Sequence, residues 1–292
     1  MPTPLGPQKK EQPSTYIVQD RENKEELARL ALQDHLLTSA MGGVLPEQPD
    51  PARFRRVLDI GCGTGGWAIE TAGAYPHMSL IGIDISNRMV EYAHKQARAR
   101  QVADRVEFRV MDALHRLEFP DGFFDLVNLR LGGSFLRTWD WSKILGEMLR
   151  VTNAGGAIRI TDQEIMHQSN SPATTQINEV VLLAFYQAGH LFSRESTGLT
   201  AQLPRLLTQH GCVDVQTKPY TLEFRAGTPE GETYSENLAI ASRTLGPFIQ
   251  KWINLNNLNE DFETLYQRSL EERKRPDFHS HWNFLCVWGK KP

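Results

Sequence analysis

The stretch from Val57 to Trp67, VLDIGCGTGGW, constrains the fold of this chain more than any other feature. Its apolar run ends in closely spaced glycines, and Gly61, Gly63 and Gly66 fit the spacing G-x-G-x-x-G. Such glycines let a chain turn sharply out of a strand and into a helix while its backbone comes close to a ligand. The stretch therefore predicts a strand, a ligand-binding turn and a helix.

The same stretch also fits the pattern D-x-G-x-G-x-G, which begins at Asp59 and runs through Gly61, Gly63 and Gly65. A dinucleotide places its pyrophosphate at the helix N-terminus, where backbone N–H groups and the helix dipole favour negative charge. A carboxylate at the end of the strand opposes that anion and suits a ligand that carries an ammonium and a sulfonium. Both interpretations need the same backbone, so the loop alone leaves them open.

Strands and helices alternate along the chain after this loop, as the changes in hydrophobic period indicate. This alternation is typical of an α/β protein with a parallel, doubly wound sheet and right-handed crossovers. The expected strands cover 57–60, 79–84, 106–111, 124–129 and 157–161, and the helices between them end near residue 73 or cover 87–102 and 139–151.

The regions around this core predict the division of the chain. Residues 1–14 are polar and rich in proline, which predicts a disordered tail, and residues 15–53 are expected to form an N-terminal helical cap and a linker. The core itself is expected at 54–226 and 279–292. Residues 227–278 predict a helical insertion that is long enough to form a cap rather than a turn.

Composition excludes several classes of protein. The chain has 292 residues and a formal net charge of −3, which is no electrostatic footprint for a nucleic acid. Cys62, Cys212 and Cys286 form no C-x-x-C pair, which argues against disulfides and a zinc site. His279 and His281 without a third ligand do not predict a metal site either. With no apolar run of membrane-spanning length, we expect a cytoplasmic protein without a membrane partner or a bound metal.

Acidic residues at the ends of three expected strands make the interpretation more specific. Asp59 precedes the glycines, Asp84 ends LIGIDIS, and Asp112 lies in VMDAL. Together with LDIGCGTG, GFFDLVNLR and RVTNAGGAIRI, they make the sequence resemble the class I S-adenosylmethionine-dependent methyltransferases of the small-molecule type. The resemblance covers residues 54–226 and extends to the tail 279–289. It implies a Rossmann-like sheet that is mostly parallel, with an antiparallel C-terminal strand.

The resemblance also implies S-adenosyl-L-methionine as cofactor and a small organic acceptor that receives the methyl group by in-line transfer in a capped pocket. Asp84 would accept hydrogen bonds from the ribose hydroxyls, and Asp112 would contact the adenine amino group. Cys62 is expected to pack rather than to act as a nucleophile, since no base lies near it in the sequence. The full cofactor set is Asp59, Gly61, Cys62, Gly63, Gly65, Asp84, Ile85, Met89, Asp112, Ala113, Asn128 and Leu129.

Catalytic candidates must lie beyond the carboxyl ends of the strands, where open parallel sheets bind ligands. A base is needed only where the acceptor atom keeps its proton. The candidates are Tyr16, Arg130, Glu164 and His167, with Ser134, Asp162 and His35 also within reach. For each of them, the alternative of a side chain that simply satisfies a hydrogen bond stays open.

The caps are expected to close the acceptor pocket. Residues 172–190 predict a helix that is apolar nearly all round, and such a helix buries more than one face. We expect one face to pack on the N-terminal helix around Leu30 and Leu37, so that removing residues 1–40 leaves the sheet folded but opens the site. Aromatic side chains expected around the pocket are Phe135, Phe185, Tyr186, Phe192, Tyr234 and Trp252.

Two other functions remain open at this stage. The literal G-x-G-x-x-G spacing fits an NAD(P)-dependent oxidoreductase, although no Tyr-x-x-x-Lys pair is evident. A non-catalytic protein could also keep the ligand loop and use its caps to bind a partner. The sequence leaves open the acceptor, the atom that is methylated, the use of a general base and the oligomeric state.

Overall fold

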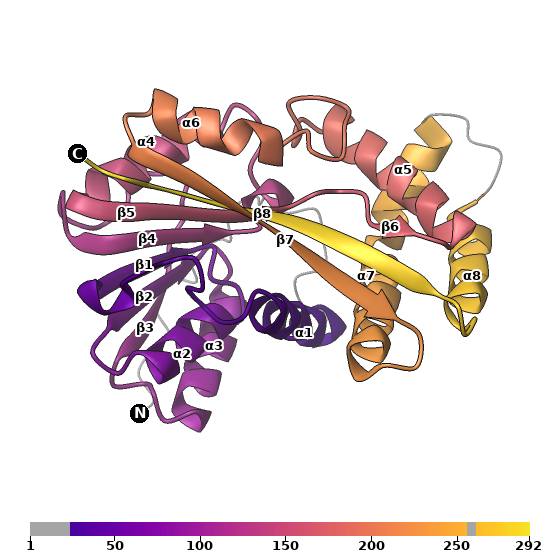
Figure 1. Ribbon diagram of the computed structural model, residues 1–292, viewed down its shortest axis with the longest axis horizontal. Helices are drawn as coiled ribbons and strands as arrows, with labels where there is room; N and C mark the ends of the chain where they lie inside the picture. Colours follow the sequence, from indigo (N-terminus) through magenta and orange to yellow (C-terminus); the bar gives the residue numbers. More distant parts are fainter. Residues whose placement is uncertain (1–23, 256–260) are drawn as a thin grey trace, which may run out of the picture.

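The computed structural model describes residues 24–255 and 261–292, so the predicted tail 1–14 and Tyr16 lie outside the described residues. At its centre is one sheet in the order β3-β2-β1-β4-β5-β8-β6, with β7 also paired to β8 (Figure 1). The strands from β1 to β5 pair in parallel, and β8 is antiparallel to its neighbours. This confirms the Rossmann-like fold. The strands are β1 (Arg56–Ile60), β2 (Ser79–Asp84), β3 (Val106–Val110), β4 (Phe124–Arg130), β5 (Thr152–Gln163), β6 (Gln168–Ser169), β7 (Val213–Arg225) and β8 (His279–Lys290).

Helices cover both faces of the sheet and one of its ends (Figure 1). They are α1 (Lys24–Ala40), α2 (Gly66–Ala74), α3 (Asn87–Ala99), α4 (Trp141–Val151), α5 (Pro172–Gln187), α6 (Leu203–Gln209), α7 (Pro229–Leu255) and α8 (Phe262–Arg273).

Several predicted boundaries differ from the structure, among them the end of the predicted helix 172–190, which lies at Gln187. The predicted helix 87–102 ends at Ala99, because Gln101 adopts a left-handed φ of 56°. The predicted helix 139–151 begins only at Trp141, after Asp140 as its N-cap. β5 is longer than the predicted 157–161, since it pairs with β8 as far as the pair Gln163 and Phe284.

The two faces of the sheet bury separate apolar clusters, because successive side chains of a strand point to opposite faces. Leu58 and Ile60 of β1 belong to the cluster that α4 and α5 cover, which includes Trp141. Val57 belongs to the other cluster, under α2 and α3, with Trp67. Both tryptophans are almost fully buried. These clusters fix the glycine loop between β1 and α2.

The hairpin of β7 and β8 extends past the other strands and carries α7 and α8 at its far end (Figure 1). Leu36 and Leu37 of α1 share an apolar cluster there with Trp282, Phe284 and other residues of the hairpin. Leu37 is fully buried. Removing residues 1–40 would therefore expose part of the hairpin's core, and the expectation that the sheet stays folded without them stays a prediction.

The predicted contact between the apolar helix and the N-terminal helix is wrong. α5 packs mainly on α7 and α8, where Ile177 and Val180 share a cluster with Ile249, Phe262 and other residues of these helices. It is α7 that packs against α1. The physical reason is that α7 and α8 of the insertion supply an apolar surface for α5, and helical periodicity in the sequence does not say which partner covers a buried face.

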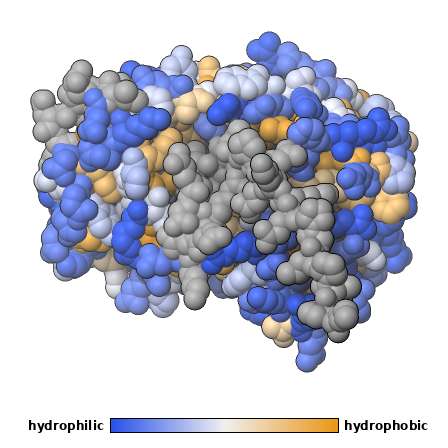
Figure 2. Space-filling model, turned by 180° about the vertical axis from the view of Figure 1, so that it is seen from behind, coloured by the Kyte–Doolittle hydropathy of each residue, from blue (hydrophilic) through white to orange (hydrophobic). Residues whose placement is uncertain are grey.

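The surface of the molecule is mixed in character. On the face drawn in Figure 2, hydrophilic side chains prevail among the described residues, and hydrophobic ones form smaller patches between them. Among the helices in 24–255 and 261–292, none combines the length and apolar character that crossing a membrane requires.

Candidate functional site

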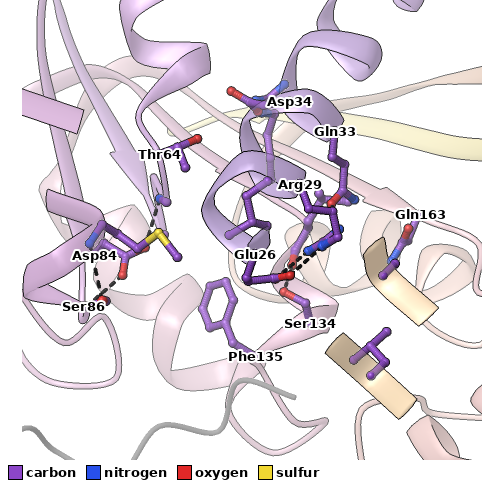
Figure 3. Close-up of a pocket in the computed structure, with 18 of the residues that line it drawn as sticks. Glu26, Arg29, Gln33, Asp34, Thr64, Asp84, Ser86, Ser134, Phe135 and Gln163 are labelled. Carbon is purple, nitrogen blue, oxygen red and sulfur yellow. Dashed lines mark hydrogen bonds and ion pairs between the residues drawn. The ribbon is translucent and has the colours of Figure 1, made fainter. Parts of the chain in front are cut away.

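A cavity of about 330 Å³ lies at the carboxyl ends of β1, β2 and β4, under a roof formed by α1, α5 and α7. This is where open parallel sheets bind their ligands. One half of the cavity is lined by the glycine loop and the residues after β2 and β3. Figure 3 shows Asp84, Ser86 and Thr64 on that side and Gln163 on the opposite side, with Glu26 and Arg29 of α1 between them. The three expected caps thus line one cavity.

The glycine loop has a backbone that side chains would hinder. Gly61, Gly63 and Gly65 have positive φ values of 64°, 52° and 78°. A Cβ on Gly61 would lie 3.0 Å from the ring of Phe135, and Gly63 donates its N–H to Asp84 at 3.0 Å. Glycine avoids the steric cost of these φ values and lets the backbone form part of the cavity wall.

Asp84 fixes the loop to the end of β2. Its two oxygens accept hydrogen bonds from the backbone N–H groups of Gly63 and Ser86, at 3.0 and 2.8 Å. Asp84 therefore has a structural role in the turn, besides lining the cavity.

Asp59 lies at the buried end of β1, with 3% of its surface exposed, and lines the cavity. Asn128 donates to its Oδ1 at 2.8 Å, and no hydrogen bond from the described residues reaches its Oδ2. Burial raises the pKa of Asp59 to about 7, against the lowering effects of Asn128 and the charge of Arg159. A positively charged ligand group beside this carboxylate would favour its ionised form.

Behind Asp59 lies a buried polar network that the sequence did not predict. Arg159 of β5 donates to Asn128 at 2.9 Å and forms an ion pair with Glu47 at 2.7 Å. The side chains of Arg159 and Glu47 are 1% and 0% exposed. A row of contacts thus leads from the linker before β1 to the carboxylate in the cavity.

Asp112 and Cys62 lie on the same side of the cavity. Asp112 accepts from the backbone N–H of Leu114 at 2.8 Å and contacts His115, so it also stabilises its own turn. Burial and the nearby carboxylates of Asp84 and Asp59 raise the pKa of the Cys62 thiol well above its usual value. The thiol is thus protonated, as a packing residue would be.

Most of the predicted cofactor residues lie together. Gly65, Asn128 and Leu129 do not line the cavity: a Cβ on Gly65 would meet Phe108 at 2.7 Å, Asn128 bridges Asp59 and Arg159, and Leu129 is in the core. Leu131 and Phe135 line it instead, one turn further along the chain. The predicted residues on the cavity wall are Asp59, Gly61, Cys62, Gly63, Asp84, Ile85, Met89, Asp112 and Ala113.

The catalytic candidates separate in the structure. His167 and Arg130 line the cavity, and Arg130 forms an ion pair with Asp34 of α1. Glu164 does not line it and instead accepts from Asn283 of β8 at 3.2 Å. Tyr16 lies outside the described residues.

Three further polar candidates were expected near the site. Ser134 lines the cavity, whereas Asp162 is buried beside it and accepts from the backbone of Gly133. The side chain of His35 is 69% exposed and lies near Glu70, away from the cavity.

Of the aromatic residues expected around the pocket, Phe135 and Phe185 line it. Tyr186 and Phe192 are exposed. Tyr234 is buried and stacks on Phe224, and Trp252 packs in the cluster of α5, α7 and α8. Aliphatic residues of α7, such as Leu245, also line the cavity. The sequence did not predict them, because the insertion carries no motif.

The roof also carries a buried ion pair that the sequence did not reveal. Arg29 of α1 donates to both carboxylate oxygens of Glu26 at 2.7 Å and to Gln33 at 2.6 Å. All three line the cavity (Figure 3). The described residues hold no cluster of three or more His, Cys, Asp or Glu side chains suited to a metal ion.

Comparisons with known proteins agree with this geometry. Residues 57–156 match the family model described as a methyltransferase domain. Demethylmenaquinone methyltransferase from Deinococcus radiodurans is 38% identical over 104 residues, which cover 36% of this chain and 41% of that protein. The same enzyme from Geobacillus kaustophilus is 29% identical over 190 residues, covering 59% and 76%.

A solved structure extends the likeness to nearly the whole chain. Phosphoethanolamine N-methyltransferase 2 from Haemonchus contortus, in complex with S-adenosyl-L-methionine, has a TM-score of 0.54 at 20% identity. The likeness covers 94% of this chain and 59% of that one, and it supports the fold. This chain spans less than half the length of the Deinococcus relative. By the family match, residues 57–156 form a methyltransferase domain, and the chain shares its fold with a solved methyltransferase.

Proposed function

We propose that the protein transfers a methyl group from S-adenosyl-L-methionine to a small organic acceptor held under the roof of α1, α5 and α7. The observation that carries this proposal is the pairing of two unlike halves in one cavity. One half has the glycine loop with Asp59, Asp84 and Asp112, and the other combines apolar side chains of α5 and α7 with paired charges of α1 and with His167. A cofactor and an acceptor would meet where the halves join.

The residues of the first half fit the cofactor. Asp59 keeps one carboxylate oxygen without a described partner at the end of β1, where the cofactor's ammonium would compensate its charge. Asp84 lines the same half at the end of β2, where its carboxylate could accept from ribose hydroxyls. Met89 and Ile85 provide apolar surface for an adenine ring, and Asp112 lies beside them on the cavity wall.

The bound cofactor would supply a methyl group on a positively charged sulfur, which is already an activated leaving group. The protein then has to hold the acceptor in line, within contact distance, and exclude water. α1 helps to exclude water. Its Leu30 lines the cavity, and its Asp34 forms an ion pair with Arg130 that joins α1 to the end of β4.

The acceptor is proposed to be a small molecule rather than a nucleic acid, because the site is roofed and the chain has a net charge of −3. The cysteines Cys62, Cys212 and Cys286 are all free, which suits a reducing compartment such as the cytoplasm.

Isothermal calorimetry with S-adenosyl-L-methionine and with NADH tests the cofactor assignment. We expect micromolar-range binding of the first and negligible binding of the second. Binding of NADH alone would favour the oxidoreductase alternative. Release of S-adenosylhomocysteine during incubation with mixtures of small hydroxyl and amine compounds would separate an enzyme from a non-catalytic binding protein.

A further inference from the structure

A short row of buried side chains lies behind His167, in the half of the cavity away from the glycine loop. Nδ1 of His167 is 2.7 Å from the hydroxyl of Tyr234, and this hydroxyl is 2.9 Å from Oγ of Ser280. Ser280 in turn donates its hydrogen to the carbonyl oxygen of Gln168, at 3.2 Å. Tyr234 and Ser280 are both fully buried, so bulk water does not complete this row.

The direction of each hydrogen bond in this row follows from its last group, the carbonyl oxygen of Gln168. A carbonyl oxygen can only accept, so the single hydroxyl hydrogen of Ser280 is committed to Gln168. Tyr234 must then donate to Ser280, and its oxygen is left to accept from His167. His167 therefore carries its hydrogen on Nδ1, and Nε2 keeps a lone pair.

That lone pair belongs to a residue on the cavity wall. His167 lines the cavity, and within 24–255 and 261–292 no hydrogen bond reaches its Nε2. The ring is held by Trp282, whose centroid is 4.7 Å away, and the backbone oxygen of His167 accepts from Asn178. Burial lowers the pKa of His167 to about 3, so the imidazole is neutral.

The surroundings select against a charged acceptor. In the described part of the chain, both arginines on the cavity wall are already paired, Arg29 with Glu26 and Arg130 with Asp34. The walls near His167 combine apolar side chains, such as Ile165 and others from α5 and α7, with uncharged polar ones such as Asn178. An anionic acceptor finds no unpaired arginine here, and a neutral imidazole with a low pKa offers little to an ammonium.

We propose that Nε2 of His167 accepts a hydrogen bond from a neutral hydroxyl group on an otherwise apolar acceptor molecule, and that Tyr234 and Ser280 act as positioning residues that fix the required tautomer. The proposal rests on the proposed methyl transfer for the identity of the site. Such a bond would orient an oxygen lone pair of the hydroxyl within the cavity.

The tautomer can be measured without any acceptor. The ¹⁵N chemical shifts of a histidine ring distinguish a protonated nitrogen from an unprotonated one, and the loss of one signal set in H167Q assigns the ring. We expect hydrogen on Nδ1 in the natural protein. In S280A, Tyr234 has lost its acceptor and is expected to donate to Nδ1, which moves the histidine hydrogen to Nε2. Hydrogen on Nε2 in the natural protein would overturn the proposal.

Binding of two matched probes tests the hydroxyl. 2-Naphthol and 2-methoxynaphthalene share an apolar skeleton, but only the first can donate a hydrogen bond. With S-adenosylhomocysteine present, we expect H167L to weaken 2-naphthol binding about 2- to 13-fold, the value of one neutral hydrogen bond. Binding of 2-methoxynaphthalene should not change in H167L. In S280A, where Nε2 carries the hydrogen, 2-methoxynaphthalene should bind no more weakly than to the natural protein, because its ether oxygen can accept from Nε2.

Two results of this experiment would count against the proposal. Equal losses for both probes would mean that His167 contributes only packing, and failure of 2-naphthol to bind would overturn the hydroxyl assignment. The affinity of each variant for S-adenosylhomocysteine serves as the control. If the natural protein does not bind S-adenosylhomocysteine, it is the proposed function that fails, whereas the tautomer measurement still stands on its own.

Discussion

Substitution of Glu47 by alanine tests the buried network behind the cofactor half of the cavity. The ion pair of Glu47 with Arg159 is almost fully buried, with the nearest N and O atoms 2.7 Å apart. Burial acts to raise the pKa of Glu47, but the charge and hydrogen bond of Arg159 outweigh it and leave the pKa lowered. Without Glu47, a buried guanidinium would keep Asn128 as a partner but no carboxylate.

The expected loss in the free energy of unfolding is about 3–5 kcal/mol, which is typical when one partner of a buried ion pair is removed. For 292 residues the entropy of unfolding is about 0.6 kcal/mol/K, so the melting temperature should fall by about 5–8 °C. Urea titration of the natural protein and of E47A gives the difference directly.

Two further variants serve as controls. Glu271 forms an ion pair with Lys274 on the surface, where both side chains are about 70% exposed, so E271A should cost about 0–1 kcal/mol. The double variant E47L/R159M replaces the buried pair by apolar groups and should recover much of the loss. If E47A were no less stable than E271A, the ion pair would not hold the linker to the sheet as inferred.

Three other predictions concern the loop, the roof and pH. Because burial raises the pKa of Asp59 to about 7, the stability of the cofactor-free protein should fall as pH rises from about 4 to 7, while affinity for the cationic cofactor increases through about pH 7. Calorimetry should find no such pH dependence of affinity in D59N, and the same slope in both proteins would contradict the assignment. G65A should lower the free energy of unfolding in urea by about 1–3 kcal/mol, since its Cβ would meet the ring of Phe108 at 2.7 Å, whereas G73A in open helical surface should cost nothing. L37A should cost about 2–5 kcal/mol in the same assay, because this side chain is fully buried against the hairpin, and a loss below 1 kcal/mol would show that α1 is loosely attached.

The central strands could be located from sequence because their limits are local. The predicted strand 79–84 matches β2, which begins after a turn and ends at Asp84. β5 could not be bounded in this way, because Asp162 and Gln163 at its end are held by pairing with β8, more than a hundred residues later, and Thr152 at its start pairs with Phe124 of β4. Local pattern thus predicts where the strands lie, but not how far pairing between distant strands extends β5.

The site could be predicted only where a motif marked it. Asp59 and Asp84 stand at strand ends, and both line the cavity. The sequence could have predicted a buried ion pair at Arg159, since a charge within an apolar strand of a sheet covered on both faces needs a buried partner. The partner, Glu47, lies 112 residues away in a proline-rich linker that has no pattern of its own. Asn128 was predicted to contact the cofactor, but its side chain instead connects Asp59 with Arg159.

The insertion between β7 and β8 has both of its ends fixed at one point, since Arg225 pairs directly with His279. The chain therefore leaves the sheet for the insertion, which includes α7, and returns from it at a single pair of neighbouring residues. A different helical segment could be grafted there at the slowly growing entropic cost of loop length, provided that it replaces the apolar faces that α7 and α8 present to α1 and α5. In such a chimera, the acceptor half of the cavity would change, whereas the glycine loop and its three carboxylates would keep the same chain path. The hairpin tip is thus the junction at which acceptor preference could diverge independently of cofactor use.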